Sequence, residues 1–259
     1  MTATGARGGE LTIARRRHER SEAIVLAVVL AGLAVSSWFA SPFWVAVVIA
    51  GQMAVGGIGA VWVIGPVRAR YGFARYATLA VAAVAATLLG KLLIPIAQVA
   101  GAPVLALLLF NVLWFELRLP EGHSPRLAVD LTLVGIVFAA SAGIGATFPA
   151  ASWPPPILLV LIVASIPALR AAELRGRFGV EAVGQAVLHL LAVAQLGVAL
   201  ALLHLPGVVS SAVLALGFHA WAGAAEALDN GARGRAVIIE FGSLGVLGLL
   251  VALLLRPGP

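Results

Sequence analysis

Apolar runs of about 20 residues follow one another along almost the whole chain, and no other feature constrains its fold as strongly. A hydrocarbon layer of about 30 Å needs roughly that length of helix, because lipid supplies no water to a non-helical backbone. We therefore predict an all-α, polytopic transmembrane helix bundle with about nine spans. The expected spans are residues 21–40, 43–65, 75–98, 103–118, 127–148, 156–172, 180–204, 207–228 and 235–255.

The composition agrees with a membrane protein, since 61% of the residues are hydrophobic and 11% are charged. A net charge of +6 would suggest nucleic acid in a soluble chain. Here the placement of the charges matters more than their sum, and we expect no nucleic-acid partner. The sequence has no cysteine, which excludes disulfides, thiolate metal sites and cysteine nucleophiles.

The arginines occupy every second connection between the predicted spans, and the intervening connections lack Lys and Arg. By the positive-inside rule, this alternation places the N-terminus in the cytosol and the C-terminus outside, with Arg256 as the exception. The residues concerned are Arg68, Arg70, Arg75, Arg118, Arg126, Arg170, Arg175, Arg177, Arg233 and Arg235.

The predicted domain organisation is simple: residues 1–20 form a basic cytosolic tail, and residues 21–259 form a single transmembrane helical domain. We expect a multi-pass protein of a bacterial-type plasma membrane, with anionic lipid headgroups bound at the cytosolic basic segments. A homo-oligomer or a partner in a membrane complex is compatible with these features.

Two secondary features concern packing and an isolated charge. Small residues of the second and fifth spans are interpreted as surfaces for close helix approach: Gly51, Gly56, Gly57, Gly59, Ser141 and Gly145. Lys91, the single lysine, and Asn111 are predicted at similar depth and form a candidate secondary polar pair. Alternatively, the long stem of Lys91 extends to the outer interface.

The last three spans contain ionisable residues within apolar sequence, and such residues mark functional sites in membranes. His189 and His219 are predicted at about 12 to 14 Å from the cytosolic side, and Glu240 at about 8 Å. Asp130 is a candidate for the border of the same cytosol-facing pocket. Helical spacing groups Glu181, Gln185, His189 and Gln195 on one face, and Ser211, His219, Glu226 and Asp229 on another.

Three interpretations of this predicted pocket compete. The histidines can simply hydrogen-bond between helices while the carboxylates pair with Arg177, Arg233 or Arg235. A proton or solute path can use His189, His219, Glu226, Glu240 and Gln185. A metal ion held by His189, His219 and Glu240, or a haem between the two histidines, is the third.

The predicted function is transport of a small polar or amphipathic solute, which is a non-enzymatic role. No P-loop, zinc-protease helix or serine-hydrolase elbow occurs in the sequence. We expect no cofactor. The alternatives are an accessory or structural subunit of a membrane complex and, third, an intramembrane metal- or haem-binding protein.

Overall fold

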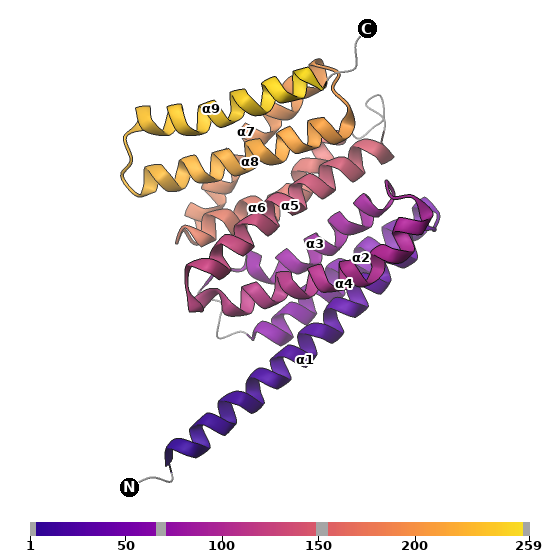
Figure 1. Cartoon of the computed structure of the whole chain (residues 1–259), viewed down its shortest axis with the longest axis vertical. Coiled ribbons are helices and arrows are strands. Elements are labelled where there is room, and N and C mark those ends of the chain that lie inside the picture. Colours follow the sequence, from indigo (N-terminus) through magenta and orange to yellow (C-terminus); the bar gives the residue numbers. More distant parts are fainter. Residues whose placement is uncertain (1–3, 66–70, 149–154, 256–259) are drawn as a thin grey trace.

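The computed structural model describes residues 4–65, 71–148 and 155–255, with side chains from residue 18 onward, and these residues form nine α-helices (Figure 1). Eight of the described helices are long and apolar enough to cross a membrane, which confirms the predicted helical bundle and fits a multi-pass membrane protein. The helices are α1 (Thr4–Trp38), α2 (Pro42–Ile64), α3 (Ala74–Gly90), α4 (Pro95–Arg118), α5 (His123–Thr147), α6 (Pro156–Leu174), α7 (Gly179–Leu202), α8 (Gly207–Asp229) and α9 (Gly234–Leu254), with a short 3₁₀ turn, η2 (Leu119–Glu121), after α4.

The first helix begins earlier than predicted. Helix α1 starts at Thr4, so the expected tail is helical from that residue, although the apolar span covers His18–Trp38. Helix formation needs no apolar side chains, and hydropathy therefore marks the span and not the whole helix. The predicted basic residues Arg68, Arg70 and Arg256 lie outside the described residues.

The predicted boundary between the third and fourth spans is also wrong. Helix α3 ends at Gly90 and α4 begins at Pro95, whereas hydropathy predicts that the third span continues to residue 98 and that the fourth begins at 103. The break falls at Ile94, whose ψ of 152° is extended, because the ring of a following proline disfavours helical geometry. Pro103 instead lies inside α4.

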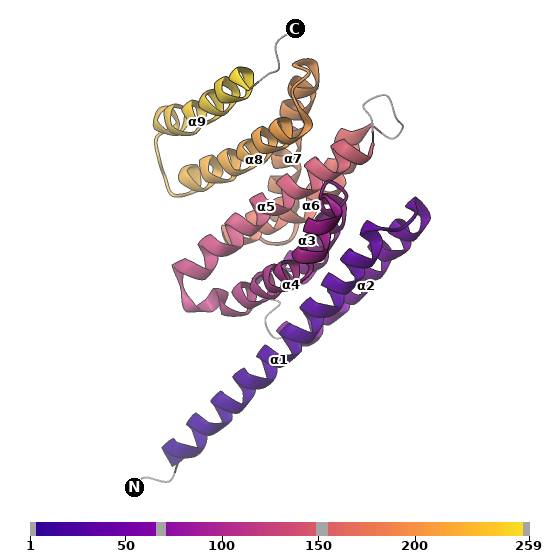
Figure 2. The same ribbon diagram turned by 45° about the vertical axis from the view of Figure 1, so that its right-hand side comes forward.

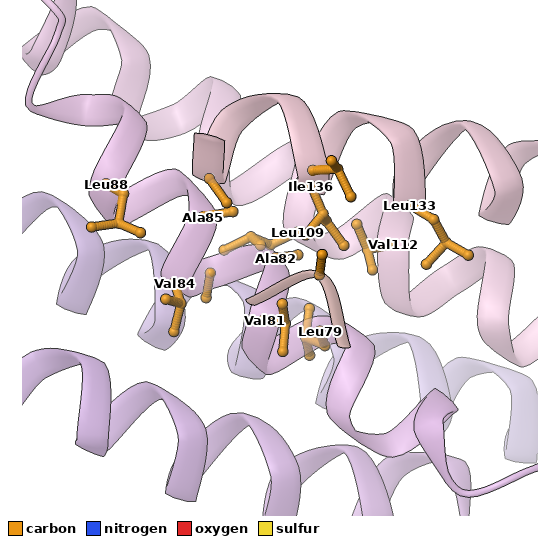
Figure 3. Packing of buried hydrophobic residues seen from close by; sticks show 14 of the residues in the cluster. Leu79, Val81, Ala82, Val84, Ala85, Leu88, Leu109, Val112, Leu133 and Ile136 are labelled. Atoms are coloured by element: carbon orange, nitrogen blue, oxygen red, sulfur yellow. The ribbon is translucent and has the colours of Figure 1, made fainter. Parts of the chain in front are cut away.

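Helix α3 lies at the centre of the N-terminal half, packed against α1, α2, α4, α5 and α6. Of its 17 residues, 13 are buried, and Ala82 and Ala85 meet Leu109 of α4 and Ile136 of α5 (Figure 3). A helix of this length rises about 26 Å, less than the roughly 30 Å of a hydrocarbon core. Neighbouring helices surround α3, so its short length exposes little backbone to lipid.

Small residues allow two close approaches to α3. A Cβ atom added to Gly56 of α2 would lie 2.8 Å from the Cα of Ala80. A Cβ atom on Gly143 of α5 would lie 2.4 Å from the carbonyl carbon of Leu88. The predicted close helix approach is therefore confirmed at Gly56. At Gly145 an added Cβ atom would have nothing within 4 Å, because this residue lines a cavity.

The remaining helices extend from α3 towards the C-terminal end of the bundle. Helices α5 and α6 pack on α3, α8 packs on α5, and α7 packs on both α6 and α8. Helix α9 packs on α8, far from α1 and α2 at the opposite end of the molecule (Figures 1 and 2). Three of these helices, α5, α6 and α8, line the candidate functional site.

A buried ion cluster connects α3, α4 and α6. The guanidinium of Arg170 donates to both carboxylate oxygens of Glu116, at 2.9 and 2.6 Å, and also to Glu173 and to the backbone carbonyl of Tyr71. Arg75 donates to the backbone carbonyl of Glu116 at 2.6 Å. The side chains of Arg75 and Arg170 are 0% exposed, so these two arginines of the predicted basic connections are internal helix residues.

Candidate functional site

A polar pocket of about 170 Å³ lies between α5, α6 and α8, at the ends of these helices that the positive-inside rule predicts to face the cytosol. We call it the cytosolic pocket after this predicted orientation. Its floor is apolar and includes Leu133, Val134 and Phe218. Ionisable groups gather on its walls because residues three to four apart on α5 and on α8 share a helix face. They are His123, Arg126, Asp130, Arg175, His219 and Glu226.

Ion pairs hold the rim of this cytosolic pocket. Arg126 contacts Glu226 at 2.6 Å, and Asp229 lies 2.8 Å from Arg177 and 3.5 Å from Arg175. Burial lowers the pKa of Arg175, against the attraction of Asp229, whereas the hydrogen bond and charge of Asp229 raise the pKa of Arg177. The predicted pairing of carboxylates with Arg177 holds for Asp229, but Glu226 is paired with Arg126.

Asp130 and His219 differ from the paired residues of the pocket, which are Arg126, Arg175 and Glu226. Among the residues that the structure describes, neither side chain makes a hydrogen bond or an ion pair within 4 Å. Both are half-buried and line the same small volume. Together with the exposed His123 at the start of α5, which also has no such partner among the described residues, this carboxyl and this imidazole can bind a solute, water or a proton.

His189 lies on the other side of Phe218. Its ring stacks on the ring of Phe218, with 4.1 Å between centroids, and its Nε2 is 3.0 Å from the Phe218 backbone oxygen. A carbonyl oxygen accepts but cannot donate, so Nε2 carries the proton. His189 is fully buried and its Nδ1 has no partner among the described residues. It supports the pocket floor but does not line the pocket.

A second cavity, of about 410 Å³, lies at the opposite ends of the same helices. Ser141 and Gly145 of α5, Val160 of α6 and Ser211 of α8 are among its lining residues, and α7 closes one side. The hydroxyls of Ser141 and Ser211 already donate to backbone carbonyls of their own helices. This outer cavity is therefore less polar than the cytosolic pocket.

Apolar residues separate the two cavities on α5, α6 and α8. Phe218 lines the cytosolic pocket and Leu214 lines the outer cavity, and four residues of helix correspond to about 6 Å. On α5, Leu133 lines the cytosolic pocket and Ser141 lines the outer cavity. Val137 lies between them and is 1% exposed. We call Val137, Leu214 and Phe218 the apolar barrier.

The structure brings only part of the predicted set together. His219 and Glu226 line the cytosolic pocket, whereas Gln185 is half-buried on α7 and Glu240 is exposed on α9, and neither lines it. His189 and His219 do lie at equal depth, about 15 Å from the ends of their helices. The pocket therefore lies between α5, α6 and α8, and not between the last three helices.

The predicted metal ligands His189, His219 and Glu240 do not form a site. Within the described parts of the chain, no group of three or more His, Asp or Glu side chains is arranged to hold a metal ion. The side chains of the two histidines lie at different faces of α8. His189 contacts the backbone carbonyl of Phe218, whereas the side chain of His219, the residue after Phe218, points about 100° away around the helix axis, towards α5 and α6.

The predicted pair of Lys91 and Asn111 is not formed by any hydrogen bond among the described residues. Lys91 donates to the backbone oxygen of Ala40 at 3.2 Å, near the outer ends of the helices. Because α4 begins at Pro95, Asn111 lies about 24 Å below that end and not level with Lys91. Lys91 therefore follows the alternative interpretation, with its ammonium near the outer interface.

Sequence reasoning missed Arg126, Arg175 and Phe218 as parts of this pocket. In the sequence the two arginines indicate only the positive-inside orientation, and a phenylalanine in an apolar run carries no signal of its own. Asp130 does carry such a signal in the sequence, because a carboxylate close to the start of a span is costly in lipid unless it faces protein or water. No family model, curated protein or solved structure matches this chain, so the candidate site depends on its geometry alone.

Proposed function

We propose that this protein carries a small polar solute across the membrane, coupled to protonation of the cytosolic pocket, along a path between α5, α6 and α8. The observation that carries the proposal is the pair of cavities at opposite ends of the same helices, separated by the apolar barrier. An arrangement of this kind suits alternating access, in which a central site opens to one side of the membrane at a time.

The ionisable residues have three different roles under this proposal. Asp130 and His219 bind the solute and exchange protons, because neither has a protein partner among the described residues. Arg126 and Glu226 form an ion pair at 2.6 Å, so neither presents an uncompensated charge at the rim of the pocket. His189 is a positioning residue that acts through the ring of Phe218.

Three small features favour a barrier that can move. Helix α6 contains Pro167, which removes a backbone hydrogen bond beside the path, and neighbouring Ala164 and Ala168 are buried without filling much volume. Helices with proline inside a span bend more easily at that point. Movement of α6 relative to α8 would widen one cavity while it narrows the other.

The test uses liposomes that contain the purified protein and needs no knowledge of the solute. Phe218→Ala removes the largest side chain of the apolar barrier, so we expect the permeability to glycerol, measured by stopped-flow light scattering, to rise about tenfold or more. Phe110→Ala is the matched control, because Phe110 stacks on Trp114 of its own helix and lines neither cavity. Equal permeability of both variants and wild type, with all three eluting as folded protein, would reject the path.

Proton coupling is tested in the same liposomes with an internal pH dye and an imposed potassium diffusion potential. Wild type should admit protons faster than protein-free liposomes, and Asp130→Asn should remove most of the excess. Glu240→Gln is the control, since Glu240 is exposed on α9 and lines no part of the path. Loss of proton entry in Glu240→Gln but not in Asp130→Asn would place the proton route elsewhere.

A further inference from the structure

A cavity between α3, α4 and α5 has no role in the proposed transport path. It has a volume of about 640 Å³, within the range of small-molecule sites, and lies between α3, α4 and α5 with Trp38 of α1 at one end. Figure 3 shows Ala82 and Ala85 of α3 beside Leu109 and Val112 of α4 within its wall. Small residues on all three helices leave the space that larger side chains would fill.

The cavity opens sideways towards the bilayer. Val104 and Leu108 of α4 and Leu131 of α5 line it, yet they are 55%, 57% and 58% exposed. Leu108 lies near the middle of the 24-residue helix α4, at hydrocarbon depth. A molecule that enters here comes from the hydrocarbon and not from water, and it must be largely apolar.

The lining has an uncharged but not wholly apolar chemistry. None of its described side chains is ionisable. The hydroxyl of Thr132 is already occupied by the backbone oxygen of Ala128 at 2.8 Å. The amide of Asn111, by contrast, lines the cavity and makes no hydrogen bond to any described residue. An amide without a hydrogen-bond partner is unfavourable in hydrocarbon, so a ligand that bonds to it is favoured.

We propose that this cavity binds an uncharged, long-chain amphiphile from the bilayer, whose chain lies along α3 and α4 and whose hydroxyl or carbonyl group bonds to Asn111. A charged headgroup is excluded, because the cavity offers no counter-ion at hydrocarbon depth. The amide can donate to a carbonyl and accept from a hydroxyl. The occupant is therefore an isoprenoid alcohol, a quinone-like carbonyl compound or a molecule of that class.

The site is independent of the proposed transport path. Gly135 and Ala139 of α5 line this cavity, whereas Asp130 and Leu133 line the cytosolic pocket on a different face of the same helix. Rejection of transport would leave this inference unaffected, and the two are tested with different variants.

The experiment measures thermal unfolding of the protein in lipid nanodiscs with farnesol, farnesene or palmitate as probes. Farnesol has a chain and a hydroxyl, farnesene lacks the hydroxyl, and palmitate carries a charge. We expect farnesol to raise the midpoint temperature by several degrees, farnesene by less, and palmitate not at all. Asn111→Leu should remove the difference between farnesol and farnesene.

Filling the cavity provides the matched pair of variants. A Cβ atom on Gly135 meets nothing within 4 Å, so Gly135→Leu should occupy the cavity without a clash and abolish the farnesol shift. Gly184→Leu on the exposed face of α7 is the control, because a Cβ atom there also has nothing within 4 Å and the gain in helix propensity is the same. This variant should keep the farnesol-induced rise in midpoint temperature. If Gly135→Leu does not fold, Ala139→Leu replaces it.

A photoreactive farnesol analogue gives a second readout, with attachment to α4 and α5 peptides expected in wild type. Equal farnesol shifts in wild type and in the filled variant, or stabilisation by palmitate as large as by farnesol, would overturn the proposal. Absence of both a shift and specific attachment would overturn it as well.

Discussion

The imidazole of His189 lies against the ring of Phe218, 4.1 Å away, while His219, the next residue of α8, lines the pocket on the other side. The two histidines that lie level in the membrane therefore act on different surfaces of one helix. His219 is open to the cytosolic pocket, whereas His189 fixes the side chain that forms its floor. Several measurements can separate these roles.

Replacement of His189 should reveal a structural contribution. His189→Ala leaves a cavity behind Phe218 and should lower the free energy of unfolding by about 2 to 5 kcal/mol, as large-to-small core changes do. His189→Phe keeps the ring stack and loses one hydrogen bond to the Phe218 oxygen, so about 1 kcal/mol is expected. Unfolding in mixed micelles with increasing denaturing detergent measures both, and equal losses would contradict the stacking role.

The buried ion cluster predicts a large effect of one neutral substitution. Glu116→Gln leaves Arg75 and Arg170, both 0% exposed, without the carboxylate between them, and should cost about 3 to 5 kcal/mol. Glu121→Gln is the control, because its pair with Arg118 is about 40% exposed and such pairs contribute at most about 1 kcal/mol. Similar unfolding midpoints for the two variants would show that the cluster adds little to stability.

Two glycines of α5 should respond differently to the same change. Gly143→Ala places a Cβ atom 2.4 Å from the Leu88 backbone, which cannot rotate away, so α3 and α5 must separate at a cost of about 1 to 3 kcal/mol. Gly145→Ala meets nothing within 4 Å and should be neutral or slightly stabilising through helix propensity. Thermal unfolding in one detergent compares them, and the reverse order would refute this packing.

The rim of the cytosolic pocket should matter less for proton entry than its interior. Glu226→Gln breaks the 2.6 Å pair with Arg126, and we expect a change of less than about threefold in liposome proton entry, since this pair is a third or more exposed. Asp130→Asn should cause a loss of about tenfold or more, because it removes the carboxyl without a described protein partner. A larger loss of proton entry in Glu226→Gln than in Asp130→Asn would make Glu226, and not Asp130, the proton-exchanging carboxylate.

The sequence by itself predicted the class of fold and most of the spans, because crossing a bilayer is a requirement on each segment separately. Its errors are local ones. Hydropathy predicts a fourth span that begins at Pro103, yet that proline lies inside α4 and the helix begins at Pro95. Neighbouring helices in a membrane bundle can satisfy the groups that an internal proline frees, and hydropathy cannot distinguish the two prolines.

Only the tertiary structure decided which polar residues meet. Depth can be counted along a helix, so the equal level of His189 and His219 followed from the sequence. The rotation of each helix about its axis depends on packing with neighbours far away in the chain, and it turned His219 towards α5 and left Glu240 exposed. For the same reason Glu116 and Arg170, 54 residues apart, gave no sign of their pairing, although burial of either charge demands a partner.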